Sequence, residues 1–368
     1  MPSSGKRRAY RIFRRNVITP PPTKTCYVNA PLTYLHDTSP PTGTTVTVAP
    51  GIEWLCMPLP FALNHINLWL LADKDEEGEG YAAVDTGISR PEVRAAWDQI
   101  LINRRLTRAI VTHLHPDHVG LAGWLEREKG APLWMSQGDY LTARMIYQDA
   151  TPFSVAGMVA FFRQHGLPDA AAAAFEQRGN AYKMGVSPPP EHYRQLFAGD
   201  VLTIGKHAWH TIVGYGHAAE HMSLYCEELR VLISGDMLLP RISTNISVQP
   251  ANPYGNPLKL FLDSIDAFLP LPADTLVLPA HGRPFRGIHD RVAQLHAHHA
   301  ERCSILLQAC KGKAANAAEL IPVLFEREFT DPHQTMFAMG EAIAHLNYLT
   351  HAGSMRRVEK NSLIRFIS

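Results

Sequence analysis

The chain has 368 residues, 46% of them hydrophobic and 19% charged, and its formal net charge is +1 with histidine neutral. This composition suits one large globular domain with an appendage, or two modest domains. A charge so near zero gives no general reason to expect a nucleic-acid partner. No apolar run approaches the roughly 20 residues that a membrane-spanning helix needs, so we expect no membrane partner either.

The N-terminal segment 1–50 is predicted to be a basic, proline-rich arm. Its first 36 residues contain no acid, and no apolar core of a secretory signal is present. We expect a solvated or surface-hugging arm on a cytoplasmic protein, with a mitochondrial transit peptide as the alternative. The stretches TPPPTKT (19–25) and SPPTGTT (39–45) are typical of an extended linker with polyproline character.

The cysteines also favour a cytoplasmic protein. They are scattered, with no C-x-x-C pair, and this pattern predicts reduced and mostly buried thiols. The five are Cys26, Cys56, Cys226, Cys303 and Cys310.

From about residue 52 the chain alternates strands and helices. Apolar runs predict the strands, while Pro91 and Gly130 mark a helix start and a helix end. The predicted order is strand 65–73, strand 80–87, helix 89–101, strand 107–115, helix 118–130 and strand 131–136. Such alternation predicts an α/β fold whose sheet is covered on its faces, in a domain spanning residues 51–290.

Residues 139–196 break this alternation with helical stretches separated by Pro and Gly, and we interpret them as a helical insertion. Strands return at 200–216, 221–236 and 274–282. The tail, 291–368, is predicted to form three helices and a hairpin, an order that resembles a small winged-helix domain. Its apolar stretch 336–353 is suited to packing or dimerisation, so we expect a homodimer.

Four predicted strands run directly into a metal-ligand residue. RAIVT leads to His113, TIVGYG to His217, VLISG to Asp236 and TLVLPA to His281. Such positions gather along one edge of an α/β sheet, where functional sites are built. Packing alone gives no reason for four separate strands to end in this way, so the sequence predicts one polar site.

The stretch THLHPDHVG (112–120) is the densest part of this pattern. His113 and His115 are two residues apart and point the same way in an extended segment. Asp117 and His118 open the following helix and turn toward a second position. Imidazole nitrogens and carboxylate oxygens are ligands of zinc, iron and manganese, so the spacing predicts a metal site in two halves.

The hexapeptide HLHPDH (113–118) resembles the H-x-H-x-D-H signature of the metallo-β-lactamase superfamily. The later G-H, G-D and A-H-G elements follow in that family's order, and the resemblance covers residues 52–290. It implies an αββα sandwich carrying the insertion and the winged-helix-like tail. It also implies that His113, His115 and His217 bind one metal ion, that Asp117, His118 and His281 bind a second, and that Asp236 bridges them.

The resemblance further implies the cofactors and the chemistry. Two divalent ions are expected, zinc first, with iron or manganese as alternatives, and Asp117 and Asp236 are the expected catalytic residues. Water between the ions would lose its proton and attack a carbonyl as hydroxide. Asp85, which ends AAVD, resembles the family's carboxylate that orients the ligands, although a helix-capping role is the alternative.

A closer resemblance is to glyoxalase-II-like hydrolases. It rests on GHAAEHMSLY (216–225) and LPAHGRPFRG (278–287), and it extends over the insertion and the tail. It implies that His221 supports the site rather than serving as a seventh ligand. Glu220 could orient His221 or could cap a helix, and the sequence leaves both open.

Residues that could select the substrate are less marked. Arg241, Arg283 and Arg286 could hold an anionic group, with surface ion pairing as the alternative. Tyr254 is a candidate pocket aromatic. The insertion adds apolar side chains that could wall an acyl channel, although core packing is the ordinary interpretation. These are Met145, Met158, Phe161 and Phe162.

The leading hypothesis is a metal-dependent hydrolase acting on a small-molecule thioester, either acylglutathione- or acyl-CoA-like. A lactonase or another carboxylic-ester hydrolase is the first alternative. A phosphodiesterase or ribonuclease is the second, although the near-neutral charge does not favour nucleic acid. Two further alternatives are less favoured. A single-iron oxygenase would not need both halves of the site, and a non-catalytic relative would be expected to lack some ligands.

Overall fold

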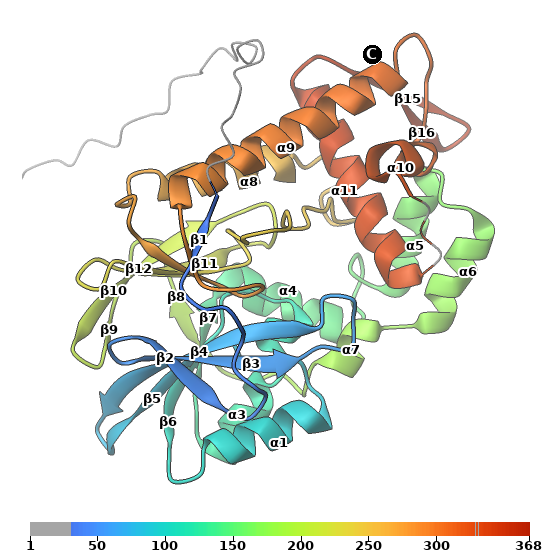
Figure 1. The fold of residues 1–368 in the computed structure, drawn as a ribbon. Helices are drawn as coiled ribbons and strands as arrows, with labels where there is room; N and C mark the ends of the chain where they lie inside the picture. The colour runs from blue at the N-terminus through green and yellow to red at the C-terminus, as the bar shows by residue number, and fades with distance from the viewer. Residues whose placement is uncertain (1–30, 328, 330) are drawn as a thin grey trace, which may run out of the picture.

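The computed structural model describes residues 31–327, 329 and 331–368, so most of the predicted basic arm lies outside the described residues. Two seven-stranded sheets pack face to face, and helices cover their outer faces (Figure 1). This arrangement is the αββα sandwich expected from the sequence.

The first sheet uses the N-terminal half of the chain, and its strand order follows the sequence. Neighbour by neighbour, its strands are β2 (Thr45–Ala49), β3 (Ile52–Pro58), β4 (His65–Asp75), β5 (Gly78–Val84), β6 (Leu106–Ile110), β7 (Leu133–Ser136) and β8 (Arg194–Leu196). Helices α1 (Pro91–Ile100) and α3 (Ala122–Lys129) pack on its outer face. The strands predicted at 65–73, 80–87 and 131–136 are thus confirmed.

The second sheet uses the C-terminal half together with one N-terminal strand. Its order is β1 (Thr33–Tyr34), β14 (Phe285–Arg286), β13 (Leu276–Pro279), β12 (Val231–Gly235), β11 (His221–Cys226), β10 (His207–Gly214) and β9 (Val201–Ile204). Helices α8 (Pro257–Ile265) and α9 (Ile288–Ala309) cover its outer face (Figure 1).

Alternating side chains explain how one strand serves two cores. In β4, Leu68 and Leu70 join α1 and α3 in the outer core, whereas Trp69 and Leu71 face the other sheet. All four are at most 2% exposed, so both faces of this strand are buried. The apolar run that predicted this strand therefore supplies side chains to both cores of the sandwich, because successive side chains point to opposite faces.

Two predicted elements differ from the structure near residue 112. The strand predicted to run through 107–115 ends at Ile110, because the N–H of Thr112 bonds the Asp85 carboxylate (2.7 Å) instead of a neighbouring strand. The helix predicted at 118–130 is two helices, α2 (Pro116–Val119) and α3, and Gly130 ends the second in the left-handed conformation. The densest ligand stretch therefore lies in the connection between sheet and helix.

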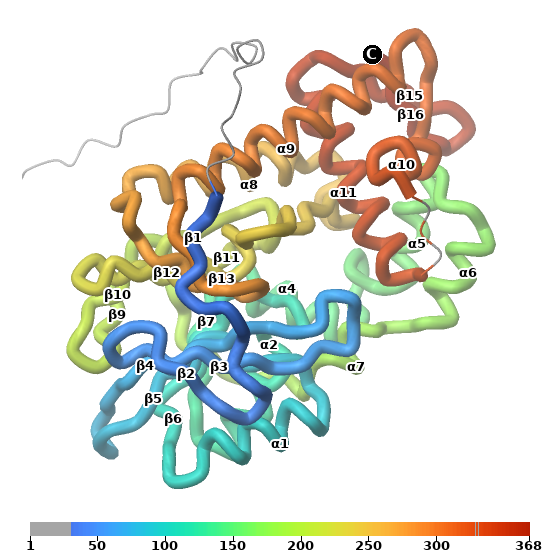
Figure 2. Tube along the Cα trace, in the orientation of Figure 1, coloured from blue at the N-terminus to red at the C-terminus, as the bar shows by residue number. Residues whose placement is uncertain are grey.

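The N-terminal arm predicted over 1–50 extends too far, since residues 33–34 and 45–49 add an edge strand to each sheet, while the predicted linker 39–45 lies almost wholly between these strands. Strand β1 pairs with β14, and β2 pairs antiparallel with β3. Figure 2 shows the chain between them passing from one sheet to the other. The edges of β14 and β3 carry backbone N–H and C=O groups that need hydrogen-bond partners. The residues of this segment that are not proline provide those partners.

The helical insertion is present, and it ends in β8. It comprises α4 (Gln137–Tyr147), α5 (Val155–Gln164), α6 (Asp169–Arg178) and α7 (Ala181–Gly185). Phe161, Phe162 and Phe175 join the core that also holds the tail helices. Figure 2 shows α5 and α6 beside the tail.

The tail has the predicted order of three helices and a hairpin. After α9 come α10 (Ala317–Phe325), α11 (Pro332–His351), β15 (Arg356–Lys360) and β16 (Leu363–Ile367).

Within the described ranges, none of the helices has the length and apolarity required to cross a bilayer. Cys56, Cys226, Cys303 and Cys310 are free and buried as predicted, and Cys26 lies outside the described residues.

Candidate metal centre

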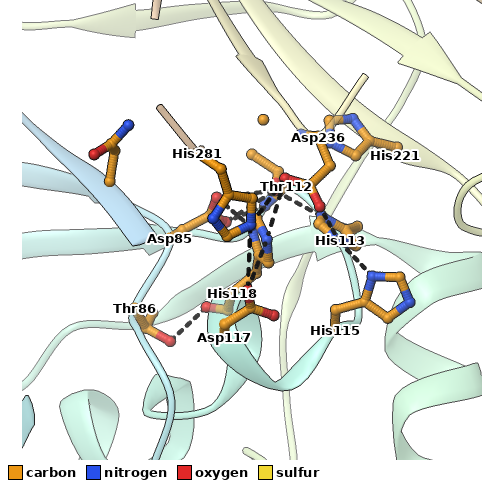
Figure 3. A network of polar contacts seen from close by, with 12 residues as sticks. Asp85, Thr86, Thr112, His113, His115, Asp117, His118, His221, Asp236 and His281 are labelled. Carbon is orange, nitrogen blue, oxygen red and sulfur yellow. Dashed lines mark hydrogen bonds and ion pairs between the residues drawn. The ribbon is translucent and has the colours of Figure 1, made fainter. Parts of the chain in front are cut away.

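The strand ends that carry ligand residues meet between the two sheets. Strands β5 and β6 run parallel, and so do β12 and β13. Strand β10 runs in the direction of β12, because both are antiparallel to β11. The carboxyl ends of these strands therefore face one place, and Figure 3 shows Asp85, His113, Asp236 and His281 converging there.

Three histidines form the first half, which we call the three-histidine group: His113, His115 and His217. The Nε2 atom of His113 lies 2.8 Å from Nδ1 of His115 and 3.1 Å from Nε2 of His217. The His115 and His217 nitrogens are also 3.1 Å apart. Three imidazole nitrogens that point at one another across about 3 Å form the donor set of a metal site rather than a hydrogen-bond chain.

The second half, the Asp117 group, contains Asp117, His118 and His281. Nε2 of His281 lies 3.4 Å from an Asp117 oxygen, and Nε2 of His118 lies 3.8 Å from the same oxygen. Asp236 stands between the two groups (Figure 3). One of its oxygens is 3.3 Å from His217, and the other is 3.6 Å from His118 and 3.5 Å from His281.

Asp85 orients ligands in both groups. It is only 2% exposed and lies in the left-handed region with φ 63°. One oxygen accepts from Nδ1 of His118 (2.8 Å), and the hydroxyl of Thr112 donates to the same carboxylate. That hydroxyl lies 3.0 Å from Nδ1 of His113 and can accept its proton. The orienting role expected of Asp85 is therefore consistent with its contacts, and they show no helix cap.

Two backbone carbonyls orient the remaining imidazoles. His217 donates from Nδ1 to the carbonyl of Asn245 (2.7 Å), and His281 donates from Nδ1 to that of His65 (2.9 Å). Since Nδ1 carries the proton in each case, the Nε2 lone pair is free to bind a cation.

These residues fit a pair of divalent ions. The buried atoms His118 Nε2 and Asp236 Oδ1 have no hydrogen-bond partner among the described residues, and both point into the centre. Unpaired buried polar atoms are costly, and a cation between them would remove that cost. The seven ligand-type atoms fall into two clusters of metal-binding size, with Asp236 grouped with the three histidines.

Charge at the centre also favours a cation. Burial lowers the pKa of His118, but the charges of Asp85, Asp117 and Asp236 outweigh burial and raise that pKa to about 10. Burial raises the pKa of Asp236, but His281 and His118 outweigh it and hold that pKa well below its usual range. The site therefore keeps its carboxylates ionised and attracts positive charge.

Some supporting residues carried no signal in the sequence. Asn67, fully buried in β4, donates to the carbonyls of Pro279 (2.8 Å) and Gly282 (2.7 Å), and so fixes the loop that carries His281. Asn245 lies in a loop without regular structure. An asparagine that bonds a distant backbone cannot be distinguished by pattern from one in a turn.

His221 and Glu220 have structural contacts. The backbone N–H of Asp236 donates to Nε2 of His221 (3.1 Å), which supports the site from behind as expected. Gly235 is required beside it, since an added Cβ would lie 2.4 Å from that nitrogen. Glu220 accepts from the N–H of Gly138 (2.7 Å) and so caps the start of α4, rather than orienting His221.

Comparison with protein families decides the identity of the fold. Residues 64–281 match the family described as the metallo-beta-lactamase superfamily, and this range contains both ligand groups. The chain belongs to the metallo-beta-lactamase superfamily. Residues 303–368 match a second family, described as the metallo-beta-lactamase-like C-terminal domain. Membership and the two ligand clusters identify a metallo-hydrolase of this superfamily.

Similar proteins cover both parts of the chain. A beta-lactamase domain protein from Burkholderia ambifaria is 43% identical, with a TM-score of 0.85 over 91% of this chain and 98% of that one. A metallo-beta-lactamase family protein from Thermus thermophilus is 28% identical, with a TM-score of 0.74 over 87% and 99%. The "Probable metallo-hydrolase YqjP" of Bacillus subtilis (strain 168) is 22% identical over 80% of this chain and 90% of its own.

A cavity of about 290 Å³ lies beside the ligands of the metallo-beta-lactamase domain. His115 and His217 lie on its wall, together with parts of α5, α6, α7 and α11. Met158 and Phe162, named from the sequence as wall candidates, line it, whereas Met145 and Phe161 do not. Two arginines that the sequence did not distinguish, Arg90 and Arg178, also line this cavity.

The predicted substrate residues lie elsewhere. Arg283 donates to the carbonyls of His36 and Asp37 and stacks over Tyr34, so it holds the segment after β1. Arg241 is exposed, with its guanidinium 5.9 Å from the Tyr34 ring.

Arg286 lies in β14 opposite Thr33 of β1. Tyr254 is 66% exposed and packs under Arg357 of the tail. None of the four residues lines the cavity beside the ligands.

Proposed function

We propose that this protein is a dinuclear metal-dependent hydrolase of thioesters, acyl-CoA- or acylglutathione-like. The observation that carries the proposal is the position of Asp236, which directs one oxygen to each ligand group. Zinc is the first candidate, with iron or manganese as alternatives. Two bound ions would polarise a carbonyl and lower the pKa of a bound water.

The chain's own residues have distinct roles in this proposal. His113, His115 and His217 would hold the first ion, and Asp236 would bridge. Asp117, with His118 and His281, would hold the second. The Asp117 side chain is 19% exposed against 11% for Asp236, so it is the better placed carboxylate to pass a proton to solvent.

The surroundings of the centre support an amphipathic substrate. The cavity beside His115 and His217 is mainly apolar, while Arg90 and Arg178 on its lining can bind an anionic part such as a phosphate or a carboxylate. A thioester of coenzyme A or glutathione combines both properties. Arg241, Arg283 and Arg286 do not line this cavity.

The tail supports assignment to the glyoxalase-II-like type. Its three helices and hairpin are joined by a bridge between Ala315 and Phe366, as in a winged-helix-like domain. Of its basic residues, Arg365 pairs with Glu319 and Arg357 stacks on Tyr254. These two side chains are thus used within the protein, and the described residues give no observation that favours nucleic acid as the substrate.

The test combines metal analysis with a substrate panel. Protein purified without added metal should contain two equivalents of zinc, iron or manganese per chain, measured by elemental mass spectrometry. Thiol release from acyl-CoA and acylglutathione compounds should exceed hydrolysis of lactones and of a bis-aryl phosphodiester. Chelation should abolish the activity, and metal should restore it.

The outcomes separate the alternatives. Hydrolysis of lactones alone would replace the thioester proposal by a lactonase, and hydrolysis of the phosphodiester alone would indicate a nuclease-like enzyme. One iron per chain would contradict the dinuclear site. The expected homodimer is tested separately by light scattering at micromolar concentration.

A further inference from the structure

Besides the residues around Arg90 and His115, three parts of the chain build the cavity beside the ligands. The insertion contributes α5, α6 and α7, the tail contributes the first turns of α11, and the loop 245–249 lies between them. Figure 1 shows α5 and α6 next to α11. The tail therefore completes one wall of this cavity, through His333, Met336 and Phe337.

The tail also fixes the loop that carries the partner of His217. Val248 donates to the carbonyl of Gly340 in α11 (3.3 Å), and Asn245 donates to Glu341 (3.2 Å). An added Cβ at Gly340 would lie 2.4 Å from the Ser247 hydroxyl, so helix and loop are in close contact. Loop and helix thus form one wall that reaches from α11 to the metal centre.

The deeper part of the lining is apolar and well packed. Leu114, Phe162, Phe175 and Val248 are each at most 7% exposed, and the half-buried Met158 and Met336 complete the surface. Methionine adapts its shape to flexible apolar ligands. The charged lining residues Arg90 and Asp149 are exposed and so mark the solvent end.

Several polar side chains on the lining are already committed within the protein. Tyr182 donates to the carbonyl of Leu114 (2.6 Å), and Asn180 donates to that of Ile146 (2.7 Å). Ser154 caps α5, and Ser247 donates to Asn245 (2.7 Å). The cavity therefore offers little to recognise hydroxyl or amino groups on an acyl chain, because its polar atoms have partners.

We propose that the acyl part of the substrate is an extended apolar chain, bound between α5 and α11 with its carbonyl at His115 and His217. This inference rests on the proposed thioester hydrolysis. It assigns Met158 and Met336 as specificity-determining residues. Short acyl groups would leave the cavity unfilled, and acyl groups with hydroxyls would bury them without partners, so both would be poor substrates.

Binding and turnover of a chain-length series test the proposal on the full-length, metal-loaded protein. Affinity for straight-chain carboxylates from acetate to decanoate, measured by calorimetry, should rise about fourfold per methylene and then level off when the cavity is full. The kcat/KM for acyl-CoA compounds of the same lengths should follow the same rise. Equal affinity for acetate and decanoate would overturn the inference.

Matched tryptophan variants locate the chain. Met158→Trp on α5 and Met336→Trp on α11 should each weaken decanoate binding at least tenfold and leave acetate binding unchanged. Ala160→Trp and Gln334→Trp are the controls, since they lie on the same helices, are exposed and do not line the cavity. Equal losses in the controls would place the ligand elsewhere. Met158→Gln, which keeps the volume but adds polarity, serves if the larger variant fails to fold.

Failure of this inference differs from failure of the proposed function. Thioester hydrolysis with no dependence on chain length would support the proposed function and contradict the inference of an apolar acyl chain. If carboxylate affinity rises with chain length but no thioester is hydrolysed, the apolar ligand is supported and the thioesterase function is contradicted.

Discussion

Two groups of buried histidines in this protein differ in the carboxylates beside them. At the metal centre, the carboxylates around His118 raise its pKa to about 10 against the effect of burial, whereas burial and the neighbouring imidazoles lower the pKa of His113 and bring that of His115 to about 3. In the tail, His299 of α9 and His345 of α11 bond each other (3.1 Å) inside the apolar core. Burial, together with the neighbouring His345, lowers the pKa of His299 to about 2, and burial lowers that of His345 to about 4.

The difference shows what makes a histidine cluster a metal site. The His299–His345 pair has no carboxylate partner within the described part of the chain, and His345 donates from Nδ1 to the carbonyl of Glu341. These imidazoles are neutral core residues. At the centre, backbone carbonyls and Asp85 accept the Nδ1 protons of His217, His281 and His118, and ionised carboxylates lie beside their Nε2 atoms. Crowding of histidines alone therefore does not predict a metal site.

The largest expected effect comes from breaking the bridge between the ligand groups. Asp236→Ala should lower kcat/KM by more than about 100-fold, the upper end for residues that only orient ligands. It should also lose metal from both groups, as measured by elemental mass spectrometry. A variant that keeps full rate would show that the bridging role is wrong.

A smaller effect is expected where a carboxylate only orients ligands. Asp85→Asn should weaken metal binding about 10- to 100-fold, because an amide has no charge and one acceptor oxygen, whereas Asp85 uses two oxygens to accept from Thr112 and His118. Competition with a chromophoric chelator measures this loss. Asp73→Asn is the matched control, a buried carboxylate that pairs with Arg108 away from the centre, and it should change stability only.

The tail histidines should affect stability and leave metal content unchanged. His345→Ala removes the partner of His299 and should cost about 1–3 kcal/mol of unfolding free energy, measured by denaturant titration. Metal content should remain at the wild-type level, whereas His118→Ala should lower it. Loss of metal from the His345 variant would mean that the two groups are not independent.

The smallest effect is a pH dependence in the tail. Burial raises the pKa of Glu341 to about 7, while its bond to Asn245 and the charge of Arg302 act in the opposite direction. A raised carboxyl pKa means that the folded state binds the extra proton, so its contribution to stability is present at low pH and lost as pH rises through about 7. Relative to wild type, Glu341→Gln should gain stability between about pH 5 and pH 8. A constant difference across this range would contradict the shift.

Local sequence pattern determined the ligands of this protein. His113, His217, Asp236 and His281 each follow an apolar strand, and parallel strands bring their carboxyl ends to one edge whatever the loops do. The spacing of His115, Asp117 and His118 separates the two groups within six residues. The sandwich follows from apolar strands such as β4, in which successive side chains point to opposite faces and enter two different cores.

Only the tertiary structure decided what surrounds the ligands. Asn67 and Asn245 support imidazoles that lie far away in the sequence, and bonds made through backbone carbonyls leave no periodic signal. Arg90 and Arg178 line the cavity while Arg283 holds the segment after β1, although all are arginines in loops or at helix ends. A ligand position depends on one strand and its end, but a cavity depends on contacts among segments more than a hundred residues apart, which composition and periodicity do not record.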